Sequence, residues 1–299
     1  MSFVEDALKF HAEHNGMLAV ASKVPLNNRE DLALAYTPGV AEPCKAIKEN
    51  KELSFEYTCR GNTVAIVSDG TRVLGLGDIG PEAAMPVMEG KAVLFKTFGD
   101  VDAIPICIDT KDPEEIIETV RRLQPTFAGI NLEDFSSPKC YEIEDRLREI
   151  CDIPVFHDDQ HGTAIACLSA VMGALRYVKK DIKDVKVVVN GCGAAGSAIG
   201  RLFVSMGFPN VIMVERVGAL YKGIDAKLDK IQRYLSEVTN PNMEKGTLAE
   251  VAKGADILVG VSGPNLFTKE IIANMADKAI VFGLANPVPE TSYEAAIAA

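Results

Sequence analysis

Two pairs of adjacent carboxylates are the residues of this chain whose spacing suggests chemistry. Glu133 and Asp134 stand in GINLEDFSSP, and Asp158 and Asp159 stand in VFHDDQHGTA. Carboxylate oxygens gathered in this way suit a hard divalent cation such as Mg²⁺ or Mn²⁺. Both pairs follow short apolar runs, so we expect them at the carboxyl ends of strands, where α/β sheets collect their ligands. The alternative is that Asp158 or Asp159 only caps the helix expected after it.

The local sequence bears on whether the first pair can share one ion. Glu133 and Asp134 would point to opposite faces of a strand, so both can bind one ion only if the chain turns there. Ser137 followed by Pro138 predicts an N-cap and a first helical position directly afterwards. The expected helix start supplies the turn.

Zinc is an alternative occupant of the second acidic segment. In HDDQH, His157 and His161 are four residues apart, a spacing that can hold zinc on a helix. We set zinc aside because the helix is expected to begin only near Gly162, and because no glutamate follows the first histidine as in HExxH. The two histidines are expected to be polar neighbours of the site.

A glycine-rich turn in VKVVVNGCGAAGSAIG is the second chemical feature. It fits GxGxxG between a strand-like run and a helical pattern, and Glu215 ends the next strand-like run. The pattern predicts a dinucleotide site in which Glu215 accepts a hydrogen bond from the ribose 2′-hydroxyl, whereas the alternative is a turn needed only for packing a helix on the sheet. An acid there favours NAD over NADP, but Arg216 could pair with a 2′-phosphate and leaves the choice open. The predicted turn residues are Gly191, Gly193, Ala194, Ala195 and Gly196.

Lys91 is the candidate general base. It lies in a segment, Pro81 to Phe98, whose apolar residues recur at helical spacing. A lysine set into an apolar helix face loses hydration, which lowers its pKa and favours the neutral amine. The alternative is a lysine whose stem packs while its ammonium reaches water. Lys96 could play either part, although its neighbours enclose it less. The apolar neighbours of Lys91 on this helix are Val87, Met88, Leu94 and Phe95.

Two residues in predicted loops complete the candidate set. Tyr36 lies in AYTPGVAEPC, and Arg72 lies in DGTRVLGLGDIG. A tyrosine hydroxyl can donate a proton, and an arginine can bind a carboxylate through two parallel hydrogen bonds. Taken singly, each is more often an ordinary surface residue.

Composition bounds the class of protein. The chain has 299 residues, 47% of them hydrophobic and 24% charged, which is enough for two domains of ordinary size. A net charge of −11 argues against nucleic acid or an anionic membrane as a partner. The seven scattered cysteines include no CxxC pair, which favours a reducing, cytoplasmic compartment over a disulfide framework. We expect no export signal and no transmembrane helix, because the chain shows no basic leader and no apolar run of ~18 residues.

The order of the expected elements indicates an α/β fold with two domains. TVAIVS and VLGLG, joined by Asp69 and Gly70, are expected to form a hairpin, and VPLNNREDLALAYTPGVAEPC is expected to be irregular. Strands then alternate with helices, which predicts a mostly parallel sheet in an N-terminal domain of residues 1–160. A long helix, Thr163 to Val178, leads into a Rossmann-type dinucleotide-binding domain of residues 161–299. Because the chain ends soon after AIVFGLANPVPE, we expect this domain to lack its usual C-terminal continuation.

Seven segments together resemble a known family. YTPGVAEPC, SDGTRVLGLGDIG, the helix with Lys91, NLEDF, HDDQHGTA, GCGAAG and ANPVPE occur in this order and resemble malic enzymes of the shorter, prokaryotic type. The resemblance implies the oxidative decarboxylation of L-malate to pyruvate and CO₂ with NAD or NADP and with Mg²⁺ or Mn²⁺. It also implies a homodimer.

The resemblance further implies roles for individual residues. Lys91 corresponds to the general base and Tyr36 to the general acid, with Asp158 as the partner of the lysine. Arg72 corresponds to the arginine that binds a malate carboxylate, and Asn286 corresponds to a substrate-side asparagine. The implied metal ligands are Glu133, Asp134 and Asp159.

These roles describe one reaction and leave two rivals. Lys91 would take the C2 hydroxyl proton as hydride leaves for the nicotinamide, and Tyr36 would protonate C3 after CO₂ is lost. The first rival is another dehydrogenase on a similar two-domain scaffold, such as an amino-acid or methylenetetrahydrofolate dehydrogenase, which requires no carboxylate-bound cation. The second is a truncated nucleotide-binding remnant without turnover.

Overall fold

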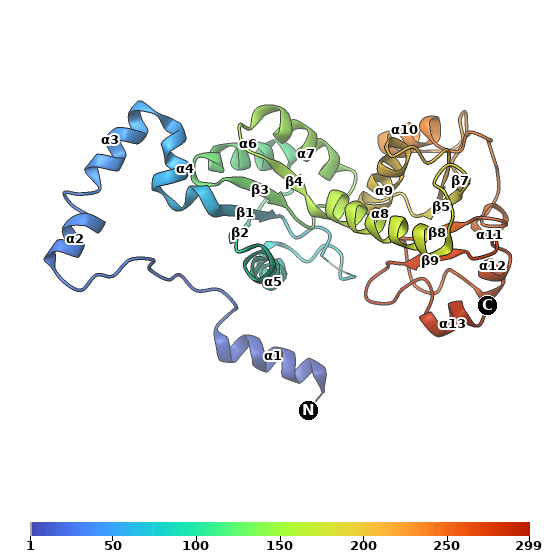
Figure 1. The fold of residues 1–299 in the computed structure, drawn as a ribbon, viewed down its shortest axis with the longest axis horizontal. Coiled ribbons are helices and arrows are strands. Elements are labelled where there is room, and N and C mark those ends of the chain that lie inside the picture. The colour runs from blue at the N-terminus through green and yellow to red at the C-terminus, as the bar shows by residue number, and fades with distance from the viewer. Residues whose placement is uncertain (1, 74) are drawn as a thin grey trace. The chain divides into compact units, whose positions relative to one another are not determined.

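The computed structural model describes residues 2–73 and 75–299, which form two compact units. The first unit contains most of the chain up to Phe156. The second contains His157–Ala299 together with Ser136–Glu142 and a short piece of the loop after Val73. Each unit has its own sheet (Figure 1), and each is described by itself.

The sheet of the first unit has four strands in the order β2-β1-β3-β4. β1 pairs in parallel with both β2 and β3, and Ile66 of β1 lies opposite Asn131 of β3. The mostly parallel α/β sheet predicted for this half is confirmed. The strands are β1 (Thr63–Ser68), β2 (Asp102–Cys107), β3 (Gly129–Leu132) and β4 (Val155–His157).

Helices cover the two faces of this sheet. α5 (Pro81–Gly99) packs on β1 and β2, and it shares a core with Ile66. α6 (Pro113–Leu123) and α7 (Lys139–Ile150) lie on the other side of the strands from α5 (Figure 1). The strands are apolar because both of their faces are covered. The buried residues of α5 are Ala84, Met88 and Ala92.

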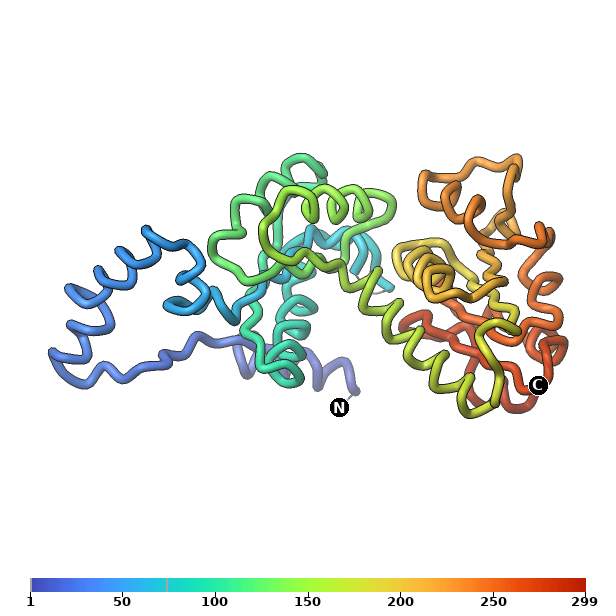
Figure 2. The backbone as a smooth tube through the Cα atoms, turned by 45° about the horizontal axis from the view of Figure 1, so that its top comes forward, coloured from blue at the N-terminus to red at the C-terminus, as the bar shows by residue number. Residues whose placement is uncertain are grey.

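Four helices that bury none of their residues precede the first sheet, and Figure 2 follows this segment in blue. The expectation that residues 24–44 are irregular was wrong, because α2 and the start of α3 lie there. Asn28 caps α2 by accepting hydrogen bonds of 2.8 and 2.9 Å from the backbone amides of Glu30 and Asp31. The helices are α1 (Phe3–His14), α2 (Arg29–Ala35), α3 (Ala41–Glu49) and α4 (Ser54–Tyr57), with 3₁₀ turns at Lys51–Leu53 and Cys59–Asn62.

The expected hairpin does not form. The two sheet neighbours of β1, which are β2 and β3, are both parallel to it. Within the second predicted strand, residues 73–77, Leu74 lies outside the described residues and the other four form no strand. The backbone amides of Ile79 and Gly80 donate instead to the carbonyl of Gly70. The segment after Asp69 is therefore a loop whose two ends are joined by these backbone hydrogen bonds, and not a β-hairpin.

The long helix begins earlier than expected. α8 runs from Asp158 to Val178, so Asp158 and Asp159 lie in its first turn and not before it. Carboxylates are favourable in a first turn because the free N–H groups there carry partial positive charge. The predicted start at Thr163 was wrong because Gly162, a residue type that often marks a helix boundary, lies inside α8. α7, by contrast, begins one residue later than predicted, at Lys139 and not at Pro138.

The sheet of the second unit has five strands in the order β7-β6-β5-β8-β9, parallel except at the edge pair β6-β7. The strand order reverses between β5 and β8, at the switch point where such sheets bind ligands. Alternate strand residues enter one core with α8, α9 and α10 and another with α11 and α12. The predicted Rossmann-type sheet is confirmed. The elements are β5 (Lys186–Asn190), β6 (Asn210–Glu215), β7 (Gly218–Ala219), β8 (Ile257–Gly260), β9 (Ile280–Gly283), α9 (Ala194–Ser205), α10 (Lys230–Val238), α11 (Leu248–Val251), α12 (Lys269–Ala273) and α13 (Tyr293–Ile297).

Among the described residues, every helix is too short or too polar to span a bilayer.

Candidate active site

A lysine and a glutamate are joined across the interface between α5 and the first sheet. The Nζ atom of Lys91 lies 3.0 Å from Oε1 of Glu133, which directly follows β3. Their side chains are only 21% and 7% exposed, so water screens this ion pair less than a surface pair. Oε2 of Glu133 accepts a hydrogen bond of 2.8 Å from Nδ2 of Asn131. The two carboxylate oxygens of Glu133 therefore face two different donors.

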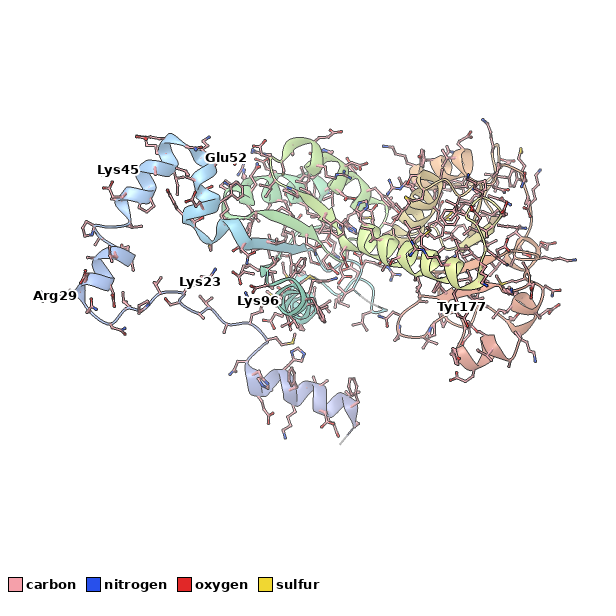
Figure 3. All side chains as sticks on the ribbon, in the orientation of Figure 1. Lys23, Arg29, Lys45, Glu52, Lys96 and Tyr177 are labelled. Carbon is pink, nitrogen blue, oxygen red and sulfur yellow. The ribbon has the colours of Figure 1, made fainter. Side chains whose placement is uncertain are left out.

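Lys96, the alternative base, is exposed on the same helix (Figure 3). Its Nζ atom lies 2.6 Å from Oδ1 of Asp100 and 3.1 Å from Oδ1 of Asp102. These hydrogen bonds raise the pKa of Lys96 above its ordinary value. Both partners of Lys96 lie outside the carboxylate cluster, whereas Lys91 pairs with Glu133 of that cluster, so Lys96 is the poorer candidate for the base.

Three carboxylates form a cluster whose chemistry fits a divalent cation. Glu133, Asp134 and Asp159 each offer one oxygen, and these oxygens lie within 4.8 Å of one another. Like charges at this separation repel strongly where they are partly buried, and a cation between them removes the repulsion. An all-oxygen donor set suits Mg²⁺ or Mn²⁺. Within the part of the chain that the structure describes, no histidine belongs to the cluster.

The backbone explains how adjacent acids reach one side of the sheet. β3 ends at Leu132, and Asp134 adopts a left-handed conformation with a φ of 58°. The chain therefore turns at the first acidic pair. The carbonyl of Asp134 accepts a hydrogen bond of 2.9 Å from the backbone amide of Arg72. Arg72 itself is exposed. The loop with Arg72 is thereby fixed beside the cluster.

The second acidic pair lies at the start of α8. β4 ends at His157 and α8 begins at the next residue, Asp158. The side chain of Asp158 lies over Gly162, one turn further along α8. A Cβ at Gly162 would come within 2.1 Å of Oδ1 of Asp158. His157 is fully buried, and its Nε2 atom lies 3.8 Å from Oδ2 of Asp159. The early start of α8 removes one argument against zinc, but the cluster itself contains only carboxylates. His157 and the half-buried His161 lie next to the cluster in sequence.

The three glycines of the turn after β5 are needed for different reasons. Gly191 has a φ of +113°, which side chains rarely allow. A Cβ at Gly196 would lie 1.9 Å from the carbonyl oxygen of Gly191, so α9 could not pack against the turn. Gly193 is different: a Cβ there would meet no atom within 4 Å. The open space at Gly193, ahead of Ala194 and Ala195 at the start of α9, fits the pyrophosphate of a dinucleotide.

Glu215 is fixed at the end of β6 by two backbone amides. Its Oε2 atom accepts from the amide of Cys192 at 3.2 Å, and its Oε1 atom accepts from the amide of Arg216 at 3.0 Å. The carboxylate is therefore tied to the glycine-rich turn. Burial, together with the charge of Glu215, raises the pKa of the Cys192 thiol, which stays protonated beside the turn.

A glutamate that the sequence analysis missed organises the loop with Asn286. Asn286 is exposed after β9, whereas Glu290 is fully buried. Oε1 of Glu290 accepts from the amides of Ser262 and Gly263 at 2.8 and 3.3 Å, and Oε2 accepts from the amide of Ala285 at 3.0 Å. Glu290 therefore ties together the loops after β8 and β9. The only sequence signal was an acid ending ANPVPE.

Tyr36 directly follows α2, and it is 66% exposed. Within the described residues, no hydrogen bond or ion pair joins it to Lys91 or to the carboxylate cluster. The structure thus brings together Lys91, Glu133, Asp134, Asp159 and the backbone of Arg72, and separately gathers the glycine-rich turn and Glu215. It does not connect Tyr36 or Asn286 to the first group.

Comparison with known families matches nearly the whole chain. Residues 15–148 match the malic enzyme N-terminal domain, and residues 160–298 match the malic enzyme NAD-binding domain. The NAD-dependent malic enzyme of Geobacillus stearothermophilus is 52% identical over 281 residues, which cover 94% of this chain and 59% of that protein. The bifunctional malic/malolactic enzyme of Bacillus subtilis is 49% identical over 294 residues, which cover 98% of this chain and 72% of that protein.

Solved structures give the same result. The crystal structure of the NAD-dependent malic enzyme from Thermotoga maritima has a TM-score of 0.95 and 47% identity, and the match covers 98% of this chain and 78% of that one. The chain spans 59% of the Geobacillus protein and 38% of the Escherichia coli NADP-dependent malic enzyme. It therefore corresponds to only part of several of these relatives.

Proposed function

Because the chain belongs to the malic enzyme family, we propose that it catalyses the oxidative decarboxylation of L-malate to pyruvate and CO₂ with reduction of NAD⁺ or NADP⁺. The observation that carries the proposal is the 3.0 Å ion pair between Lys91 and Glu133. It puts the Lys91 amine against a carboxylate of the acidic cluster, and a cation bound by that carboxylate would favour the neutral amine, which is the base that a C2 hydroxyl requires. A proton acceptor and a cation site can then act on the same substrate oxygen.

Each catalytic residue acts at a particular atom of the substrate. Lys91 takes the proton of the C2 hydroxyl while hydride leaves C2 for the nicotinamide, and Asp158 assists the lysine as its partner. After the bond to the departing CO₂ has broken, Tyr36 delivers a proton to C3 and pyruvate results. Arg72 binds a malate carboxylate through its guanidinium, and the amide of Asn286 orients the substrate.

Glu133, Asp134 and Asp159 are the residues that would hold the metal ion. When bound, Mg²⁺ or Mn²⁺ would supply a Lewis acid that polarises the C2 oxygen and offsets negative charge developing there. The all-carboxylate donor set and its oxygens within 4.8 Å of one another support this assignment.

The glycine-rich turn and Glu215 form the proposed nucleotide site, with a preference for NAD. The open space at Gly193 and the N-terminus of α9 suit the pyrophosphate. Glu215, held by the amides of Cys192 and Arg216, is placed to accept from a ribose 2′-hydroxyl and would repel a 2′-phosphate. The exposed side chain of Arg216 is the feature that would favour NADP.

We propose a homodimer formed through the N-terminal helices. α1, α2 and α3 bury none of their residues, although they carry large apolar side chains. Large apolar side chains exposed to water are unfavourable, and a second copy would cover them. The exposed apolar residues of these helices and of the segment between α1 and α2 include Phe3, Leu8, Val20 and Leu34.

Two broader assignments accompany the activity. We divide the chain near residue 160 into a substrate and metal domain and a nucleotide-binding domain, as the two family matches support. The seven cysteines are all free thiols, which supports a reducing, cytoplasmic location.

A steady-state assay tests the proposal. The chain is incubated with L-malate, Mn²⁺ and either NAD⁺ or NADP⁺, and the absorbance of the reduced nucleotide is followed. We expect turnover that is faster with NAD⁺, disappears with EDTA and returns with added Mn²⁺. Turnover of an amino acid or a folate that is insensitive to EDTA would identify the other kind of dehydrogenase. Nucleotide binding without turnover of any 2-hydroxy acid would identify a remnant.

A further inference from the structure

Asn131 is a buried polar side chain in a strand that is otherwise apolar. It lies on β3 between Ile130 and Leu132 and is 2% exposed. Its Nδ2 atom donates to Oε2 of Glu133 at 2.8 Å, but its Oδ1 atom is buried without a hydrogen-bond partner among the described residues. A buried acceptor without a donor disfavours the folded state, and an apolar residue of similar size would avoid this penalty. Stability therefore does not explain the amide.

Sheet geometry explains which neighbours Asn131 can reach. Side chains two apart on an extended chain share a face, so Asn131 and Glu133 point to the same side. Ile66, opposite Asn131 in register on β1, packs in the core with α5. This is the side from which Lys91 of α5 reaches Glu133. Because a carboxylate only accepts hydrogen bonds, the atom of Asn131 that faces it must be the nitrogen.

The terminal bond of a glutamate rotates easily unless its oxygens are held. Here one donor meets each oxygen: Nδ2 of Asn131 at Oε2 and Nζ of Lys91 at Oε1. We propose that Asn131 is a positioning residue that fixes the rotation of the Glu133 carboxylate, so that its contacts with the base and with the cation stay aligned. The inference rests on the proposed function, which makes Glu133 a metal ligand. Hydrogen-bond partners of metal ligands commonly contribute about 10–100-fold to metal affinity.

Direct binding of Mn²⁺ without substrate tests this role. Asn131→Leu removes the donor at nearly constant size, and Asn131→Val is the second variant should the first not fold. The signal of free Mn²⁺ in electron paramagnetic resonance gives the Kd. We expect the Kd for Mn²⁺ to rise about 10–100-fold, with a lower kcat and with the Kd for NAD⁺ unchanged within about twofold.

Two control variants separate the possible outcomes. Ile66→Val alters the core beneath α5 but leaves both Asn131 and Lys91, the donors to Glu133, in place, and it should bind Mn²⁺ as the wild type does. Equal weakening in Ile66→Val and Asn131→Leu, or wild-type affinity in Asn131→Leu, would overturn the positioning role. Glu133→Gln tests the metal site itself and should lose most Mn²⁺ binding. If the wild type bound no Mn²⁺, or if Glu133→Gln bound it normally, the proposed metal site and the inference would both fail. Loss in Glu133→Gln without any loss in Asn131→Leu would overturn the inference alone.

Discussion

A Cβ at Gly162 would lie only 2.1 Å from Oδ1 of Asp158. The Asp158 carboxylate can therefore keep its position in the first turn of α8 only if residue 162 is glycine. Gly162→Ala should therefore displace Asp158. We expect kcat with malate to fall on the order of tenfold or more, because a small misplacement of a catalytic group is costly.

Gly173 is the matched control on the same helix, since a Cβ there would meet nothing within 4 Å. Gly173→Ala should keep full activity and raise the free energy of unfolding by up to about 1 kcal/mol, because alanine favours the helix. Equal kcat values in the two variants would show that Asp158 does not need its observed position. Steady-state kinetics and urea unfolding give both quantities.

Lys91→Ala should abolish most turnover. Loss of a general base lowers kcat by about 10²–10⁴-fold. Lys91→Arg should be similarly inactive, because a guanidinium preserves the charge but does not release its proton near neutral pH. Lys96→Ala, on the exposed face of the same helix, should retain activity, since Lys96 pairs with Asp100 and Asp102 instead. Activity that survives in Lys91→Ala but is lost in Lys96→Ala would reverse the two assignments.

Much of the fold followed from local signals. The start of α6 is encoded locally, because Asp112 caps the helix and Pro113 fits its first position. α2 escaped prediction because a seven-residue helix between prolines shows too little periodicity. The start of α8 was misplaced because a glycine inside a helix looks like a boundary until its contact with Asp158 is known.

The site was less predictable than the fold. Residue types and motifs indicated Lys91 and the carboxylates, but the ion pair with Glu133 depends on how α5 packs on β1 and β2, which no local pattern encodes. Asn131 was missed because a single amide in an apolar run has no motif. Glu290 was missed because its role comes from backbone amides of two loops far apart in sequence.

The glycine-rich turn allows ligand binding and folding to be tested separately. Gly193→Ala should fold normally, because its Cβ would meet no protein atom, yet bind NAD⁺ at least about tenfold more weakly, because the Cβ would enter the space proposed for the pyrophosphate. Gly196→Ala should instead destabilise the domain, since its Cβ would overlap the carbonyl of Gly191. Calorimetric titration with NAD⁺ and thermal unfolding distinguish the two effects. Unchanged affinity in Gly193→Ala would place the nucleotide elsewhere.

Alkaline pH should destabilise the fold through Cys167. Burial raises the pKa of this thiol from 9.0 to about 12. Between these values the folded chain keeps a proton that the unfolded chain has lost, so stability falls as pH rises, by about 1.4 kcal/mol per pH unit for one such group. Below the unfolded pKa the contribution is constant. Urea unfolding at several pH values should show a shallower alkaline decline for Cys167→Ala than for the wild type, whereas exposed Cys59→Ala should leave the decline unchanged. Parallel curves for the wild type and Cys167→Ala would contradict this linkage.

Glu215 and Arg216 should have opposite effects on nucleotide choice. Glu215→Gln removes the charge that would repel a 2′-phosphate but keeps one oxygen to accept from the amide of Cys192 or Arg216. The ratio of kcat/KM with NAD⁺ to kcat/KM with NADP⁺ should therefore fall on the order of tenfold, which corresponds to about 1.4 kcal/mol of differential transition-state binding. Arg216→Gln should weaken NADP⁺ alone, because only the 2′-phosphate offers a charge to that side chain. If both variants left the ratio unchanged, the end of β6 would not contact the adenosine ribose, and the preference for NAD would need another cause.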